Sequence, residues 1–181
     1  MERYRFHADG AVFFVTFSVV DWLPVFVSER ACRILVDSLN YCHHQKGLRI
    51  NAYVLMPTHF HGILFHATFR ADALQTVLTD LHKFTGRELS DLCVREMPAC
   101  FTEVLRKSAG QDRERRFWQP TRHPELLCSE RFWRQKLDYL HDNPCRKGLV
   151  LRADSWRFSS ASYWLSDGGA RNDVILSGIE W

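Results

Sequence analysis

The sequence has no pair of cysteines at CxxC spacing, no long uninterrupted apolar run and no large excess of charge of one sign. Its six cysteines therefore form neither a zinc knuckle nor a dithiol redox site, and we expect them to be reduced, apolar residues. The longest apolar run, residues 11–20, contains Thr16 and Ser18 and is about half as long as a membrane-crossing helix requires. The first residues have no apolar stretch of the kind found in a secretory signal. These absences predict a cytoplasmic protein without a membrane segment.

The composition is typical of one soluble globular domain, with 181 residues of which 46% are hydrophobic and 25% charged. The net charge of +3 is too small to establish a polyanionic partner by itself. The basic residues nevertheless gather in two stretches, residues 106–122 and 131–147, and aromatic residues are interleaved with the bases within these stretches. This pattern suits a groove for phosphates and stacked bases, and it is equally typical of a solvated charged surface.

Hydrophobic patterning predicts a β-α-β-β-α-β order followed by one more helix. The run at 11–20 is rich in β-branched and aromatic residues, as buried strands are. Apolar residues then recur at helical spacing between Ser28, a suitable N-cap, and Gly47, a suitable stop. The predicted strands are 11–20, 49–56, 59–67 and 115–119, and the predicted helices are 28–46, 71–92 and 129–141.

This order is the ferredoxin-like α+β pattern, with an antiparallel sheet and an additional C-terminal helix that carries Tyr139. Only two residues separate the second and third strands, which predicts a hairpin. We expect residues 93–114 to form a long loop with at most one helical turn near 103–107. Asn143-Pro144 should end the last helix, and residues 149–181 should form an extended tail that packs its aromatic side chains on the body.

The strongest local feature is His59-Phe60-His61. Side chains alternate along a strand, so both imidazoles share one face and Phe60 points to the other. Two imidazoles on one strand face can hold a single metal ion, but they can also be two unrelated histidines on a solvated sheet face.

A second group is Tyr139 and Asn143, which lie one turn apart on the same helix face. The phenol is a potential nucleophile. The amide oxygen is a hard ligand that suits Mg²⁺ or Mn²⁺. Taken alone, the pair is equally a tyrosine at an interface and an asparagine at a helix end.

Taken together, these segments resemble the single-tyrosine HUH transposases, in the branch of the REP-associated tyrosine transposases. Residues 54–64 look like the HUH motif (His, bulky hydrophobe, His), and residues 139–150 resemble the tyrosine helix. Residues 10–16, 83–89 and 155–160 are similar to the opening strand, the second helix and the stretch after the tyrosine helix.

The resemblance runs from about residue 5 to residue 165, which defines a transposase domain at 1–165 and a tail at 166–181. Thr58 stands where the family commonly has Asn, a difference from which we expect little effect on metal binding. The segment 93–114 is longer than the family pattern.

The resemblance implies that single-stranded DNA is cleaved and rejoined through a 5′-phosphotyrosine on Tyr139. His59, His61 and Asn143 would hold one divalent ion, Mg²⁺ or Mn²⁺ rather than zinc, because none of these three side chains is a thiolate or a carboxylate. The implied substrates are palindromic repeat (REP) hairpins with a short single-stranded flank. We expect a monomer, with a homodimer as the alternative. The expected DNA contacts are phosphate-binding bases and one stacking residue: Lys83, Arg87, Arg115, Arg116, Arg131, Lys136, Arg146 and Lys147, with Trp118 for stacking.

Three other functions compete with this one. A domesticated protein that binds nucleic-acid hairpins without cutting them would need neither Tyr139 nor the histidine pair. A relaxase or rolling-circle initiator commonly has a third histidine in the metal cluster or two tyrosines on the helix, whereas here Tyr139 stands alone with Asn143. A two-histidine RNA phosphodiesterase needs two HxT/S motifs, and His59-Phe60-His61 is not one.

Overall fold

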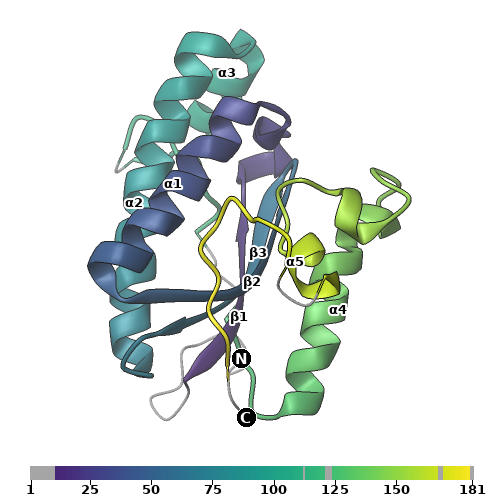
Figure 1. Cartoon of the computed structure of the whole chain (residues 1–181). Helices are drawn as coiled ribbons and strands as arrows, with labels where there is room; N and C mark the ends of the chain where they lie inside the picture. Colours follow the sequence, from purple (N-terminus) through teal and green to yellow (C-terminus); the bar gives the residue numbers. More distant parts are fainter. Residues whose placement is uncertain (1–10, 112, 121–123, 167–168, 180–181) are drawn as a thin grey trace.

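The computed structural model describes residues 11–111, 113–120, 124–166 and 169–179. An antiparallel sheet of four strands, in the order β2-β3-β1-β4, separates α1, α2 and α3 on one side from α4 and α5 on the other (Figure 1). The strands are β1 Val12–Ser18, β2 Leu48–Met56, β3 His59–His66 and β4 Glu125–Leu126. The helices are α1 Glu29–Lys46, α2 Ala71–Glu96, α3 Ala99–Lys107, α4 Glu130–Arg146 and α5 Ala161–Leu165, with short 3-10 turns at Val20–Trp22, Val25–Val27 and Ala153–Ser155. The expected α+β class and the β-α-β-β-α-β order are confirmed.

Strict alternation along β1 and β3 gives the sheet two different faces. Phe17 lies opposite Phe60 across the strand pair, and both point toward α1 and α2. One position along each strand, Thr16 lies opposite His61 and points toward α4. A period of two residues thus places Phe17 and Phe60 on one face, and Thr16 and His61 on the other.

Local sequence signals fix α1 and the hairpin that follows it. The Ser28 side chain accepts a hydrogen bond from the backbone N–H of Ala31, and Gly47 ends the helix with φ of 69°. A Cβ atom at Gly47 would also lie 2.7 Å from the His66 ring. Both the positive φ and this close contact therefore favour glycine at position 47. The predicted hairpin between β2 and β3 is confirmed.

Helix α4 covers the second face of the sheet with a smaller apolar cluster. Leu140 packs there with Val54, Ile63 and Phe14. The helix begins at the predicted N-cap, Ser129, whose hydroxyl accepts from the N–H of Phe132.

The predicted end of this helix at Asn143-Pro144 is wrong, because α4 continues to Arg146. Proline lacks an N–H and so removes one hydrogen bond. The last turn is closed instead by the N–H groups of Lys147 and Leu149, which donate to the carbonyl oxygens of Asn143 and Pro144.

Two further expectations between α2 and α4 are wrong. Residues 93–107 are mostly helical, because α2 extends to Glu96 and α3 buries Leu105 against the main core. The fourth strand is β4, not residues 115–119; of the latter, Trp118 forms only an isolated bridge with Val19. Its apolar side chain is buried in the core and is not part of a strand face.

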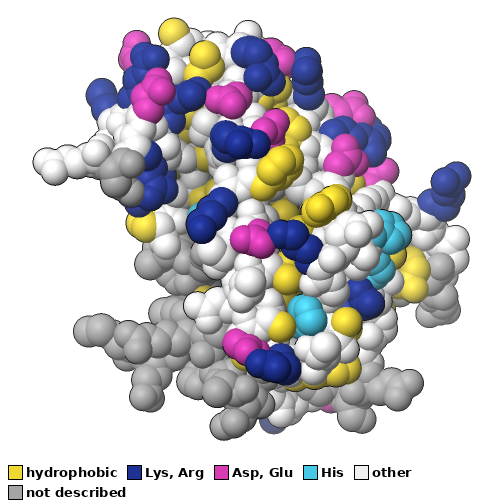
Figure 2. Space-filling view, turned by 90° about the vertical axis from the view of Figure 1, so that its left-hand side faces the viewer, with side chains coloured by type: hydrophobic (Ala, Val, Ile, Leu, Met, Phe, Trp, Pro, Cys, Tyr) yellow, Lys and Arg dark blue, Asp and Glu magenta, His cyan; other side chains and the backbone are white. Residues whose placement is uncertain are grey.

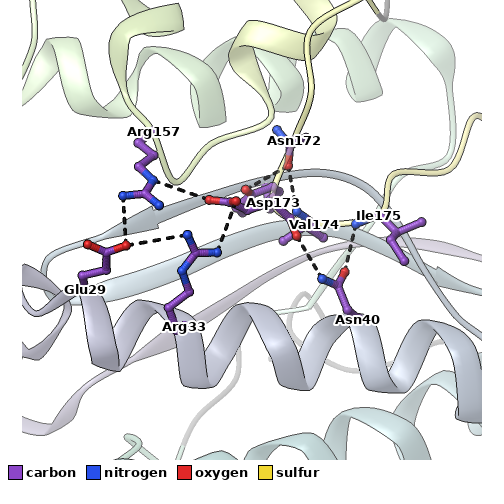
Figure 3. A network of polar contacts seen from close by, with 9 residues as sticks. Glu29, Arg33, Asn40, Arg157, Asn172, Asp173, Val174 and Ile175 are labelled. Carbon is purple, nitrogen blue, oxygen red and sulfur yellow. Dashed lines mark hydrogen bonds and ion pairs between the residues drawn. The ribbon is translucent and has the colours of Figure 1, made fainter.

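The chain after α5 returns across the sheet edge and is attached to α1 and β2. Asp173 bonds to Arg33 and Arg157 through its carboxylate, and its backbone oxygen accepts from the Asn40 side chain (Figure 3). Further along, the N–H of Ser177 donates to the carbonyl of Ile50. The prediction of an extended tail is wrong for α5, but the indoles of Trp156 and Trp164 do pack on the body, where they donate to β2 carbonyl oxygens.

All six cysteines lie in the described part of the chain, and none of them is paired. Among the helices that the structure describes, none combines the length and the apolar character needed to cross a membrane.

Candidate active site

The two histidines lie at the start of β3 on the face that α4 covers, with ring centroids 4.6 Å apart. Each ring is held by a threonine: Nδ1 of His61 lies 2.7 Å from Oγ1 of Thr16, and Nδ1 of His59 lies 2.8 Å from Oγ1 of Thr58. Within the described residues, neither Nε2 atom has a hydrogen bond. When Nδ1–H donates to the threonine, Nε2 keeps a lone pair for a metal ion.

Burial keeps both imidazoles neutral at physiological pH. It lowers the pKa of His59 to about 4 and that of His61 to about 3. Positive charge adds to the effect, from Lys147 near His59 and from Lys136 near His61. A neutral imidazole is the form that ligates a metal.

Tyr139 stands over the histidine pair from α4. Its ring centroid lies 5.6 Å from that of His61 and 6.0 Å from that of Phe14, and the side chain is 38% exposed. Two cations border the ring: the guanidinium of Arg146 at 5.5 Å and the ammonium of Lys136 at 5.8 Å from the centroid. The structure thus brings the predicted phenol and the predicted histidines to one place.

Asn143 follows Tyr139 by one turn of α4 and is 5% exposed. Asn143 lies in sequence between Lys136, whose charge lowers the pKa of His61, and Lys147, whose charge lowers that of His59. No hydrogen bond of the Asn143 side chain occurs within the described residues. An amide oxygen with no hydrogen bond there is available as a ligand.

This donor set could hold one divalent ion. The described residues contain no group of three or more His, Cys, Asp or Glu side chains that could hold a metal, which excludes a closed zinc site built from such ligands there. Two imidazoles and one amide leave positions for oxygen atoms of water or phosphate, as Mg²⁺ and Mn²⁺ require.

The candidate DNA contacts divide into two groups. Lys83, Arg87, Arg115 and Arg116 line a pocket of about 400 Å³ between α2 and the segment 113–118. On this side of the molecule basic and acidic side chains are interspersed (Figure 2), and Arg115 pairs with Asp91 at 3.1 Å. Residues 112 and 121–123, in the first basic stretch, lie outside the described residues.

The prediction of Trp118 as a base-stacking surface is wrong. Its side chain is 3% exposed, its indole N–H donates to Oγ1 of Thr85, and its ring stacks on Phe26. The indole is a core residue beneath the basic pocket.

The second group of candidate contacts belongs to α4 and its C-terminal end. Arg131, Arg146 and Lys147 are exposed. Lys136 is 17% exposed and its ammonium lies 2.7 Å from Glu125 Oε1, beside Phe14. The Lys136 side chain is therefore largely shielded from solvent and lies beside Tyr139.

Sequence reasoning missed three residues of this site: Thr16, Glu125 and Trp22. Strand alternation could have identified Thr16, because it is an even number of residues away from the other β1 residues that face α4, and it pairs with His61. The hydroxyl of Thr58, where the family commonly has Asn, lies 2.8 Å from Nδ1 of His59. The indole of Trp22 lies 5.9 Å from the His59 ring, and no pattern in the sequence marks it.

No protein-family model matches the chain, and no curated protein matches it in sequence. Among solved structures, it is similar over 100% of its length to 95% of a REP-associated tyrosine transposase bound to a REP hairpin, with a TM-score of 0.67 and 18% identity. A candidate transposase from Deinococcus radiodurans matches 78% of the chain over 97% of its own length, with a TM-score of 0.47 and 20% identity. The chain therefore has the fold of a REP-associated tyrosine transposase, the family that its motifs resemble.

Proposed function

We propose that this protein is a transposase that cleaves and rejoins single-stranded DNA at palindromic repeat hairpins through a 5′-phosphotyrosine on Tyr139. The observation that carries the proposal is the approach of the Tyr139 ring to 5.6 Å from the ring of His61, across two elements far apart in sequence. A fold of this kind supports many functions, so the argument depends on this constellation and not on the fold alone.

The buried polar groups support a catalytic role. Burying imidazoles and an amide without full hydrogen bonding costs stability. His59, His61 and Asn143 are 9%, 6% and 5% exposed. Their cost is understandable if they bind an ion and, through it, the scissile phosphate.

The reaction assigns a separate task to each side chain. Tyr139 Oη attacks the phosphorus, the bond from phosphorus to the 3′ oxygen breaks, and that oxygen leaves as a free 3′-hydroxyl. The phenol proton passes to water, and Lys136 and Arg146 lie beside the ring where they favour negative charge on its oxygen. His59, His61 and Asn143 would hold the divalent ion, which when bound stabilises the charge on the phosphate oxygens.

The linkage on the tyrosine is itself a phosphodiester, so a 3′-hydroxyl can attack it and restore a DNA backbone without ATP. The protein therefore needs no nucleotide cofactor. Mg²⁺ or Mn²⁺ is the proposed ion, and EDTA should remove it.

The proposed substrate is a DNA hairpin with a single-stranded flank. The solved structure to which the chain is similar holds a REP hairpin. The basic pocket on α2 and the exposed Arg131, Arg146 and Lys147 provide positive charge for the phosphates. A monomer suffices in this proposal, because the histidines and Tyr139 meet within one chain. The cytoplasmic location expected from the sequence stays a prediction.

The test is incubation with labelled single-stranded repeat hairpins and Mg²⁺, followed by denaturing gel electrophoresis. The wild type should give a protein–DNA adduct that Tyr139→Phe and EDTA both abolish. Tyr41→Phe, at an exposed tyrosine of α1, is the matched control and should leave the adduct unchanged. Binding of hairpins with no adduct under any of these conditions would favour the domesticated hairpin-binding protein instead.

A further inference from the structure

The loop between β1 and α1 presents an exposed indole beside the histidine pair. Trp22 is 56% exposed, and its ring stands edge-on to that of His59, with centroids 5.9 Å apart and planes at 84°. Neither core cluster includes it. A large aromatic side chain in this position contributes little to the core, so its role is better sought in what binds at the surface.

The backbone that holds this indole is strained and yet firmly fixed. Asp21 and Trp22 have φ of 51° and 54°, in the left-handed region that side chains other than glycine rarely adopt. Such conformations persist where the surroundings determine them, and they concentrate at functional sites.

Hydrogen bonds on both sides tie this loop to the turn that precedes His59. The N–H of Val19 donates to the carbonyl of Thr58, and the N–H of Phe26 donates to the carbonyl of Pro57, each at 3.0 Å. The N–H of Trp22 itself donates to the carbonyl of Val19. One turn therefore anchors the backbone of both the loop and the start of β3.

We propose that Trp22 is a stacking subsite for a nucleobase of the single strand next to the phosphate that is cleaved. Every base has a π-face, so an exposed indole binds single strands with little dependence on sequence. Stacking here would hold the strand so that its phosphate lies at the histidine pair. The inference rests on the proposed function, since it takes His59 and His61 as the phosphate site.

A nucleobase explains the surroundings better than an apolar protein partner does. The indole lies next to a candidate ion site, and the positive charge of Lys147 acts on the same histidine. An exposed aromatic ring next to a candidate phosphate site suits a ligand that alternates aromatic bases with phosphates.

The test measures binding of a DNA hairpin flanked on both sides by oligothymidine, by fluorescence anisotropy with Mg²⁺. Tyr139→Phe is the background in all proteins, so that cleavage does not intervene. A single abasic residue is then placed at each position of the flank in turn. Trp22→Ala should bind the intact hairpin about 10- to 100-fold more weakly, whereas Trp22→Phe should keep most of the affinity.

The abasic series locates the base. In the background protein one abasic position near the cleaved linkage should weaken binding, and Trp22→Ala should be insensitive at that position alone. The matched control is Phe69→Ala, at another exposed aromatic residue with φ of 54°, and it should bind like the background protein.

The proposal is overturned if Trp22→Ala binds the hairpin as tightly as the background protein, or if every abasic position weakens both proteins equally. Thermal unfolding checks that each variant is folded. If the wild type forms its tyrosine adduct while Trp22→Ala changes nothing, the stacking subsite alone is wrong. If the background protein does not bind hairpins and the wild type forms no adduct, both proposals are wrong.

Discussion

On the face of the sheet that α1 and α2 cover, Phe17 and Phe60 stack at 5.7 Å within a continuous apolar core. One residue along each of the same strands, on the face that α4 covers, Thr16 is bonded to His61, which adjoins Tyr139. The first face contains what stabilises the fold. The second contains polar groups that are buried at a cost. The alternation of a strand lets one hairpin supply both, so substitutions on one face should leave the role of the other intact.

The largest expected effect is on the apolar face. Phe60 is fully buried between Phe17 and Tyr53, and Phe60→Ala leaves a cavity that should lower the free energy of unfolding by about 3–5 kcal/mol. Urea unfolding measures the loss. Protein that remains folded should still form the tyrosine adduct. A folded Phe60→Ala protein without adduct formation would contradict the separation of the two faces.

His61→Ala should have the opposite pattern. Loss of one proposed ligand should slow cleavage by about 100- to 1,000-fold, while the free energy of unfolding changes by only about 1 kcal/mol. Single-turnover cleavage of a labelled hairpin measures the first quantity, and urea unfolding the second. His44→Ala, at an exposed histidine of α1, should change neither. Unchanged cleavage in His61→Ala would exclude this ring from the reaction.

Acid should destabilise the protein through the polar face. Burial lowers the pKa of His59 to about 4 and that of His61 to about 3. Between the ordinary histidine pKa of about 6.5 and these values, the unfolded chain binds protons that the folded chain does not. The stability is therefore complete above about pH 6.5 and is lost as the pH falls.

Together these two histidines should lower the free energy of unfolding by about 4 kcal/mol between pH 7 and pH 5. Chemical denaturation at a series of pH values measures the decrease. The double variant with alanine at His59 and His61 should show a flatter dependence. An equally steep dependence in the double variant would place the responsible groups elsewhere.

The smallest of these effects concerns a residue that acts through a histidine. Thr16→Val removes the hydroxyl that holds Nδ1 of His61 with almost no change in shape. We expect half-maximal cleavage to require an about 10-fold higher Mg²⁺ concentration. Thr16→Ser should restore the wild-type value, and stability should change little. A Mg²⁺ titration of cleavage is the measurement, and identical titration curves for wild type and Thr16→Val would show that the hydroxyl does not position the ring.

The sequence predicts those parts of the fold that have strong local signals. The N-cap at Ser28, the stop at Gly47 and the short turn at Pro57-Thr58 locate α1 and the hairpin correctly. The shared face of His59 and His61 follows from strand alternation alone. The approach of Tyr139 to these histidines does not follow from alternation, because it depends on how α4 packs on the sheet. The family resemblance implied this packing, and local sequence patterns do not contain it.

The errors arise where tertiary contacts override local pattern. Phe117 and Trp118 are apolar because the core buries them, not because they form a strand. The true fourth strand has two residues, too few for any alternation to show. Pro144 is tolerated in the last turn of α4 because the following N–H groups close that turn.

The central claim is that Tyr139 becomes covalently attached to the 5′ phosphate of the cleaved strand. The direct measurement is tandem mass spectrometry of the protein–DNA product after nuclease trimming and proteolysis. We expect a nucleotide phosphate on the peptide that contains Tyr139, at the phenol oxygen. A nucleotide on any other side chain, or cleaved DNA with no protein attached, would contradict it.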